Sequence, residues 1–212
     1  NSTLACTLVA VKKDVPVVHV EAGLRSYDRR MPEEINRVLT DQVADRLYTT
    51  ERSAESNLLR EGVDPERISF VGNVMIDSLL QNRKLAREPA DTLKAEGFSP
   101  ELIAGPERYG IVTLHRPSNV DHPGTLASLL EALNDIAAQL PLIFALHPRT
   151  RANIERFGLD HQIKSRRLVL LPPQGYLEMV GLLAGARIVL TDSGGLQEET
   201  TALGVPCLTL RE

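Results

Sequence analysis

Tryptophan is absent from this 212-residue chain, and aromatic residues make up only 4% of it. Proteins that bind single-stranded nucleic acid stack bases on aromatic side chains, so this composition argues against such a platform. The formal net charge is −4, and Lys and Arg never form a block longer than a pair. We therefore expect no basic surface for nucleic acid.

Cysteine is also scarce. Cys6 and Cys207 are isolated thiols, which favours a reducing compartment over a disulfide framework. No apolar run approaches the ~18 residues that a membrane-spanning helix needs, and no signal peptide opens the chain. These features predict a soluble cytoplasmic protein that has no nucleic-acid or membrane partner.

The usual cofactor and metal motifs are missing. Neither GxGxxG nor GxxxxGK[ST] occurs, which removes the main support for a dinucleotide site or a P-loop. The chain has only five histidines and contains no HxxxH or CxxC. His19 and Glu21 form an HxE pair, but the PCxxC of zinc deaminases does not follow it. We predict no metal site and no cofactor.

What the chain does contain is an alternation of short Val-, Ile- and Leu-rich runs with helical patterns. The patterns predict strands over residues 15–22, 45–50, 67–72, 109–115, 142–148, 167–173, 187–192 and 206–211. They predict helices over residues 31–44, 52–62, 125–140, 150–158, 175–186 and 195–204, and a linking helix over 73–86. Apolar strands separated by helices indicate parallel sheets covered on both faces. We predict an α/β fold of two doubly wound units, which join around residues 72–108; within the join, the Pro-containing segment 87–108 is polar.

Four predicted strand exits are unusually polar, and ligands of such sheets collect beyond the carboxyl ends of the strands. The exits are HVEAGLRS (19–26), VTLHRPSN (112–119), FALHPRT (144–150) and LTDSGG (190–195). Glu21 is expected to be partly desolvated and so suited to acid/base chemistry, with an ion pair to Arg25 or Arg37 as the alternative. His115 can donate or accept a proton near neutral pH. His147 is better explained by a structural role.

The stretch TDSGGLQEE (191–199) has two interpretations. Gly194 and Gly195 would let the backbone approach a ligand, and a helix start attracts anions. Alternatively, Ser193 caps the helix while Glu198 and Glu199 complement its macrodipole. The residues alone leave both interpretations open.

The PEEINR stretch (32–37) is an ordinary helix start when it is considered alone. Arg37 lies four residues after Glu33, so we expect a surface ion pair between them. Adjacent helical residues point ~100° apart, and for this reason Glu33 and Glu34 are not expected to serve one site.

Six stretches together resemble one family, the non-hydrolysing UDP-N-acetylglucosamine 2-epimerases. They are HVEAGLRS (19–26), PEEINR (32–37), FVGNVMID (70–77), TLHRPSN (113–119), LPPQGYLEM (171–179) and TDSGGLQEE (191–199). The resemblance implies two Rossmann-like domains that face a cleft (GT-B-like), with UDP held mainly by the second. It assigns residues 1–74 to an incomplete first domain and residues 75–212 to the second, UDP-binding domain, which lacks its end. It also implies a homodimer of the full-length protein.

The family interconverts UDP-GlcNAc and UDP-ManNAc by inverting C2, through elimination and re-addition of UDP, and supplies ManNAc units for cell-surface polysaccharides. By resemblance, the acid/base carboxylates are Glu21 and Glu33, and the catalytic histidine is His115. The resemblance gives the following substrate-binding residues: Arg37 near the diphosphate, Gln174 and Met179 beside the uracil, Ser193, Gly194 and Gly195 at the phosphate, and Glu199 on the ribose hydroxyls.

The sequence departs from the family at several points. Pro117 and Ser118 stand where many members have Arg-Glu, which leaves allosteric regulation by a second UDP-GlcNAc open, and Met179 replaces an aromatic residue of some members. The first domain of the family begins well before Asn1, so we expect these 212 residues to be a piece that is inactive alone. A hydrolysing epimerase, a glycosyltransferase of the same fold and a non-catalytic nucleotide-sugar-binding fragment are the alternatives.

Overall fold

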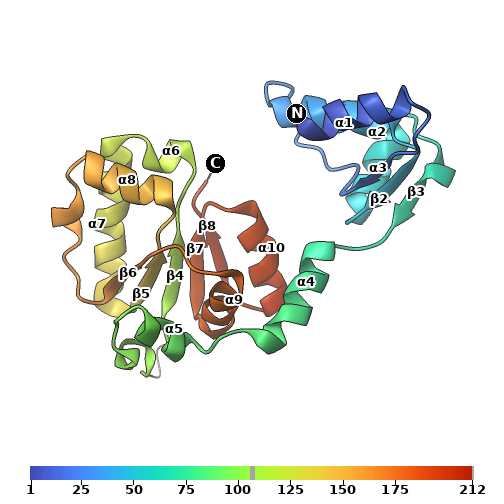
Figure 1. Cartoon of the computed structure of the whole chain (residues 1–212). Coiled ribbons are helices and arrows are strands. Elements are labelled where there is room, and N and C mark those ends of the chain that lie inside the picture. The colour runs from blue at the N-terminus through green and yellow to red at the C-terminus, as the bar shows by residue number, and fades with distance from the viewer. Residues whose placement is uncertain (106–107, 212) are drawn as a thin grey trace. The chain divides into compact units, whose positions relative to one another are not determined.

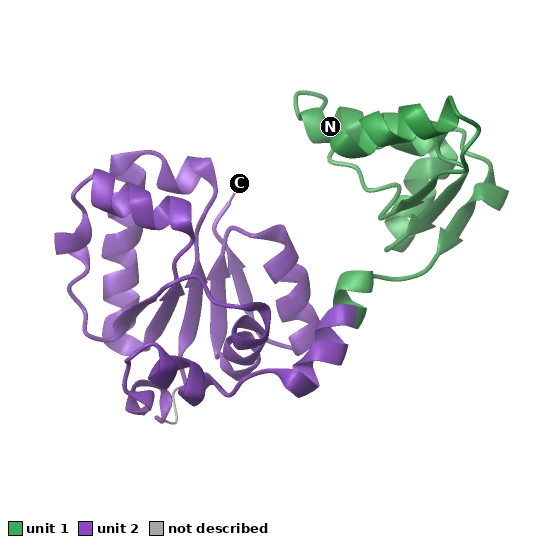
Figure 2. Ribbon diagram, viewed as in Figure 1, with its two compact units in different colours: residues 1–77 green, residues 78–212 purple. Residues whose placement is uncertain are grey.

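The computed structural model describes residues 1–105 and 108–211, which form two compact units, Asn1–Asp77 and Ser78–Glu212 (Figures 1 and 2). Both units are α/β with parallel sheets, which confirms the predicted fold class. The assignment of domains to residues 1–74 and 75–212 stays a prediction. None of the helices in the described ranges is long and apolar enough to cross a membrane.

The first unit has a three-stranded parallel sheet in the order β1-β2-β3. Its elements are α1 (Ser2–Val11), β1 (Val18–Val20), α2 (Pro32–Val43), β2 (Arg46–Thr49), α3 (Arg52–Arg60), η1 (Pro65–Arg67) and β3 (Ile68–Phe70). Pro32 begins α2 and two glutamates follow in its first turn, because a fixed φ and negative charge both favour a helix start. The predicted helix over 31–44 is confirmed.

The core of the first unit is small. It consists of Ala22, Ala44, Leu47, Leu58 and Val63. By contrast, apolar side chains of α1 and β1 are exposed, among them Val9 at 57% and Val18 at 52%. The helix α1 packs against α2. The turn that follows β1 is therefore fixed mainly by polar contacts.

The second unit has a five-stranded parallel sheet in the order β6-β5-β4-β7-β8. Its strands are β4 (Gly110–Thr113), β5 (Leu142–Ala145), β6 (Leu168–Leu171), β7 (Ile188–Thr191) and β8 (Cys207–Thr209). From β4, the next two strands, β5 and β6, extend the sheet to one edge. The chain then crosses back, and β7 and β8 lie on the other side of β4. This reversal makes the carboxyl ends of β4 and β7 the topological switch point, where ligands of open α/β sheets bind.

Helices cover both faces of this sheet, as its apolar strands predict. They are α5 (Pro89–Ala95), α6 (Pro117–Val120), α7 (Pro123–Gln139), α8 (Pro148–Arg156), α9 (Tyr176–Gly185) and α10 (Gly194–Leu203), with η3 (Pro100–Ile103) and η4 (Asp160–Gln162). Val112 packs with Leu126 and Leu130 of α7. Its neighbour Ile111 packs on the other face with Leu182 of α9, since successive strand residues point to opposite faces.

In the described part of the second unit, two short α-helices were not predicted. The segment 87–108, predicted as a polar join, contains α5, because Pro89 starts a turn and Leu93 is fully buried in the core; residues 106–107 lie outside the described residues. The helix α6 begins at Pro117, within the polar exit of β4. The predicted linking helix is α4 (Val74–Asn82), which η2 (Arg83–Leu85) follows.

Gly23, in the turn after β1, has a φ of 79° and lies against α3. A Cβ there would lie 2.5 Å from the backbone oxygen of Ala54. Gly62 has a similar φ of 81°, but no atom lies within 4 Å of its Cβ position. We predict that Gly23→Ala lowers the free energy of unfolding by ~1–3 kcal/mol more than Gly62→Ala, measured by urea denaturation. If both variants lose the same free energy of unfolding, the positive φ alone requires glycine at position 23, and the contact with Ala54 adds nothing.

Candidate functional site

The switch point of the second unit joins His115 to Asp192. His115 follows β4, Asp192 follows β7, and Thr113 pairs with Thr191 at the ends of these strands. The hydroxyls of Thr113 and Thr191 are 2.7 Å apart. Nδ1 of His115 lies 2.9 Å from Oδ1 of the fully buried Asp192. Because Nδ1 faces this carboxylate, Nε2 is the nitrogen of His115 that is left for a ligand.

Asp192 also accepts hydrogen bonds from the backbone at the exit of β4. The backbone N–H groups of His115 and Arg116 donate to Oδ2 at 3.0 and 2.8 Å. Nδ2 of Asn119 donates to the same oxygen at 3.0 Å, and to the carbonyl of Leu210 at 2.8 Å. Asp192 therefore fixes both the ring of His115 and the backbone that carries it.

The helix α10 starts at the same edge of the sheet, directly after Asp192. Ser193 is its N-cap, and its hydroxyl accepts a hydrogen bond from the backbone N–H of Leu196 at 3.5 Å. Gly194 opens the helix, and a Cβ there would lie 3.4 Å from Nη1 of Arg211. Gly195 follows it in the first turn. The predicted cap at Ser193 is confirmed, but the predicted macrodipole role of Glu198 and Glu199 is wrong, because α10 begins at Gly194 and its first turn contains no acidic residue. The ligand interpretation stays a prediction.

Glu199 is half-buried one turn farther along α10. Burial, and then the charge of Glu198, raises the pKa of Glu199 above its ordinary value. The pKa of Tyr176 is also raised, by burial and then by the charge of Glu199. Shifted pKa values cluster at functional sites, and these two residues therefore fit a candidate site.

Gln174 and Met179 lie in the segment between β6 and the middle of α9. Nε2 of Gln174 donates to the carbonyl of Pro172 at 2.9 Å and lies 3.4 Å from Oε1 of Glu96. Met179 is half-buried and packs against the same apolar cluster as Leu196 of α10. His147 caps α8, where its Nδ1 accepts a hydrogen bond from the N–H of Arg149, and its ring centroid is 5.4 Å from that of His115.

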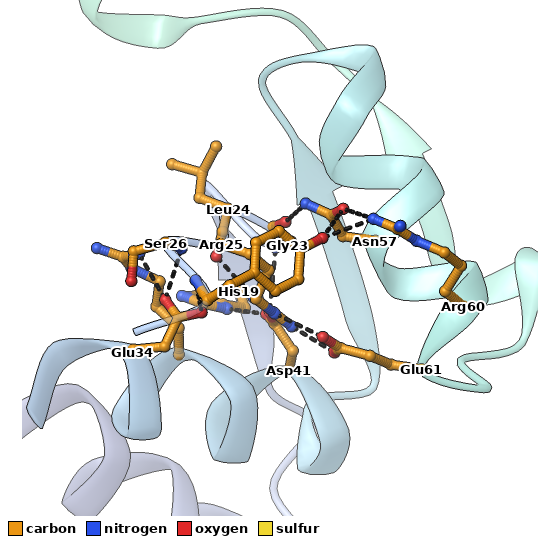
Figure 3. A network of polar contacts seen from close by, with 12 residues as sticks. His19, Gly23, Leu24, Arg25, Ser26, Glu34, Asp41, Asn57, Arg60 and Glu61 are labelled. Carbon is orange, nitrogen blue, oxygen red and sulfur yellow. Dashed lines mark hydrogen bonds and ion pairs between the residues drawn. The ribbon is translucent and has the colours of Figure 1, made fainter. Parts of the chain in front are cut away.

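In the first unit, Glu21 follows β1 with a φ of 66°, which is uncommon for a residue other than glycine. Its side chain is exposed, so the expected desolvation is wrong: only three strands shield this exit. The ion-pair alternative is also wrong within the described ranges. Arg25 pairs instead with Asp41 and Glu61 (Figure 3), and Arg37 pairs with Glu34.

The helix α2 presents Glu33 and Glu34 differently. Glu33 is exposed, and the expected Glu33–Arg37 pair is wrong, because Nη1 of Arg37 lies 3.1 Å from Oε2 of the buried Glu34. Burial acts to raise the pKa of Glu34, but hydrogen bonds from the N–H groups of Ser26 and Tyr27, with the charge of Arg37, lower it overall. Glu34 therefore holds the turn at Ser26 and Tyr27, whereas the side chain of Glu33 stays accessible to solvent.

The predicted site residues thus fall into two groups. His115, Ser193, Gly194 and Gly195 meet at one edge of the second unit, whereas Glu21, Glu33 and Arg37 lie around one turn and helix of the first unit. Asp192 and Asp41 were not among the predicted site residues. The position of Asp192 directly after an apolar strand was visible, but its contacts with residues ~75 positions away were not. Asp41 carried no sequence signal, since it lies within an ordinary helical pattern.

A parallel sheet of this strand order, covered by helices on both faces, defines a doubly wound, Rossmann-like α/β protein. A family model described as UDP-N-acetylglucosamine 2-epimerase matches residues 1–212. The chain belongs to this family.

Individual relatives agree with this assignment. The UDP-N-acetylglucosamine 2-epimerase of Methanococcus maripaludis is 42% identical over 215 residues, which cover all of this chain and 58% of the relative. The UDP-2,3-diacetamido-2,3-dideoxy-D-glucuronate 2-epimerase of Pseudomonas aeruginosa is 46% identical over 215 residues, covering all of this chain and 56% of the relative.

A solved structure is also similar. The UDP-GlcNAc 2-epimerase of Methanocaldococcus jannaschii in complex with UDP-GlcNAc and UDP matches with a TM-score of 0.81 and 42% identity, covering 99% of this chain and 57% of that chain. The chain thus spans less than two thirds of the length of these relatives.

We predict that Asp192→Ala lowers the free energy of unfolding by ~2–5 kcal/mol, because it leaves several donors at the exit of β4 without their acceptor. Urea denaturation followed by circular dichroism measures this loss. Glu155→Ala is the matched control, since it breaks an exposed pair with Arg151 on α8 and is expected to have little measurable effect. Equal losses in the two variants would contradict the role given to Asp192.

Proposed function

We propose that the natural chain containing these residues interconverts UDP-GlcNAc and UDP-ManNAc by inverting C2 of the sugar. One observation carries the proposal. His115, which Asp192 fixes, and the start of α10, which directly follows Asp192, adjoin at the switch point of one parallel sheet. A proton-transfer group beside an anion-attracting helix start suits a reaction in which UDP leaves and returns. The names of the relatives support the same reaction.

In this proposal the second unit holds UDP. The turn of Ser193, Gly194 and Gly195 receives the diphosphate, and Glu199 accepts hydrogen bonds from the ribose hydroxyls. Gln174 and Met179 adjoin the uracil. A ligand that donates hydrogen bonds to Glu199 favours its ionised form, against the burial that raises its pKa.

The chemistry requires one base and one acid. Glu21 and Glu33 exchange the proton at C2, the C1–O bond breaks, and its electrons leave with the β-phosphate of UDP. Arg37 and His115 stabilise the charge that develops on this leaving group. Re-addition of UDP to the 2-acetamidoglucal, with protonation of C2 on the opposite face, gives the epimer. No electrons are gained or lost overall, and the proposal therefore needs no redox cofactor.

The finer parts of the proposal concern the whole protein. We infer that it acts as a cytoplasmic homodimer without a metal, and that its product supplies ManNAc units for cell-surface polysaccharides. Product analysis by proton NMR separates this activity from a hydrolysing epimerase, which would release free ManNAc with UDP.

A second candidate substrate is UDP-2,3-diacetamido-2,3-dideoxy-D-glucuronate. The Pseudomonas aeruginosa relative named for UDP-2,3-diacetamido-2,3-dideoxy-D-glucuronate is 46% identical to this chain, against 42% and 44% for two archaeal relatives named for UDP-GlcNAc. The two sugars share UDP and the acetamido group at C2, and they differ at C3 and C6. Assaying both with the same enzyme, and comparing kcat/KM, decides between them.

We predict that Glu199→Ala weakens UDP binding to the chain by ~1–3 kcal/mol, since it removes an acceptor that is charged when bound. Isothermal titration calorimetry measures the change. Glu198→Ala is the matched control, because it makes the same charge change ~100° away around the helix. Unchanged affinity in Glu199→Ala would reject the ribose assignment.

We predict that Glu21→Gln lowers the turnover of the natural chain ~10²-fold or more, as expected for the loss of a positioned acid/base group. Deuterium incorporation at C2 in D₂O measures proton exchange directly. The melting temperature should barely move, because the side chain of Glu21 is exposed. Glu66→Gln, at another exposed carboxylate of the first unit, is the control. Near-normal exchange in Glu21→Gln would exclude Glu21 as the base or acid.

A further inference from the structure

Asp41 is a fully buried carboxylate on α2, and its two oxygens bind His19 and Gly23 (Figure 3), which precede and follow Glu21 in the chain. Oδ1 lies 2.6 Å from Nδ1 of His19, two residues before Glu21. Oδ2 accepts a hydrogen bond from the backbone N–H of Gly23, two residues after it, at 3.0 Å. One side chain thus clamps both ends of the turn that carries Glu21.

The conformation of this turn explains why it needs a clamp. Glu21 has a φ of 66°, and a left-handed conformation in a residue other than glycine costs ~1–3 kcal/mol unless the surrounding structure enforces it. Gly23 is tightly packed against α3, and its carbonyl accepts a hydrogen bond from Nδ2 of Asn57 at 3.0 Å. The strained residue therefore lies between two anchored neighbours.

The charge of Asp41 is balanced within the same network. Nη1 of Arg25 lies 2.8 Å from Oδ2 of Asp41, and Nη2 of Arg25 lies 2.6 Å from Oε2 of Glu61. Only 1% of the Arg25 side chain is exposed. Burial acts to lower the pKa of Arg25, but hydrogen bonds and charges from Glu61 and Asp41 raise it overall, so the guanidinium stays charged. A buried carboxylate is tolerated when it is paired in this way.

A second acid of α2 holds the far end of the same turn. Oε2 and Oε1 of Glu34 accept hydrogen bonds from the N–H groups of Ser26 and Tyr27, each at 2.9 Å. Glu34 and Asp41 are two helical turns apart on one face of α2. The same helix carries Glu33 and Arg37. The turn with Glu21 and the helix with Glu33 are therefore joined into one rigid piece.

We propose that Asp41 is a positioning residue, which holds the carboxylate of Glu21 in place for proton exchange at C2; this inference rests on the proposed epimerisation. Asp41 does not touch the reacting atoms. It acts through Glu21, by fixing the backbone on both sides of it. Displacing a reacting group by ~1 Å is enough to lower a rate ~10²-fold.

The test is a double-mutant cycle in the natural chain that contains these residues. Asp41→Ala is expected to lower kcat for UDP-GlcNAc ~10–100-fold, with KM changed less than about threefold. In the Glu21→Gln background, the same change should cost less than about twofold, because the group that Asp41 positions is already gone. A merely structural role would instead reduce the rate by the same factor in both backgrounds, and that result would overturn the proposal.

A matched control lies between α2 and β2. Asp45 also accepts a backbone hydrogen bond, from Val17 at 2.7 Å, but four residues before Glu21. Asp45→Ala should leave kcat within about twofold of the unchanged chain. If Asp41→Ala does not fold, Asp41→Asn replaces it, since Asn keeps one oxygen for Gly23, and a kcat equal to that of the unchanged chain would then reject the inference.

Hydrogen exchange separates this inference from the proposed function. The amide of Gly23 is expected to exchange at least ~10-fold faster in Asp41→Ala, which leaves this N–H group without its acceptor, than in the unchanged chain, without substrate. If the unchanged chain does not convert UDP-GlcNAc, the proposed function is refuted. The exchange rate of the Gly23 amide still decides, independently of any activity, whether Asp41 holds the turn. Unaltered exchange at Gly23 would overturn the clamp itself.

Discussion

The buried carboxylate of Asp192 is the contact on which the candidate site of the second unit depends. Parallel strands end with backbone N–H groups that the next strand no longer pairs, and a buried N–H group without an acceptor is costly. Asp192 accepts from two such groups after β4 and also faces the ring of His115. The same residue precedes the N-cap of α10. The contacts that complete the end of the sheet therefore also orient the ring of His115.

The first unit uses a similar arrangement at the exit of β1. There Asp41 comes from a helix rather than from a strand, and it binds both His19 and the backbone of Gly23. In both units a carboxylate that is inaccessible to water fixes a polar turn, and the residue with candidate chemistry stays accessible beside it. Rigid support with an exposed reactive group is the arrangement that catalysis requires, because misplacement lowers rates steeply.

Periodicity predicted most of the fold, because the strands are apolar on both faces and their helices are long enough to show a pattern. It missed α5, where one buried residue, Leu93, supplies most of the apolar signal. The pairing of Arg37 could not be predicted, since Glu33 and Glu34 both lie within helical reach of it. Arg37 pairs with Glu34 because the N–H groups of Ser26 and Tyr27 bind the carboxylate of Glu34 and hold it in place. The left-handed backbone of Glu21 likewise follows from tertiary contacts rather than from local sequence.

Glu199 illustrates how a residue that we propose for ligand binding opposes the stability of the fold. Burial and the charge of Glu198 raise its pKa above the ordinary value of 4.5. An acid whose pKa is higher in the folded state lowers stability as the pH rises from the ordinary pKa through the raised one, because the unfolded chain then releases its proton more readily. At neutral pH the ionised carboxylate therefore acts against folding. A partner that donates hydrogen bonds to Glu199 would reverse this effect, which is consistent with a residue retained for a ligand rather than for the core.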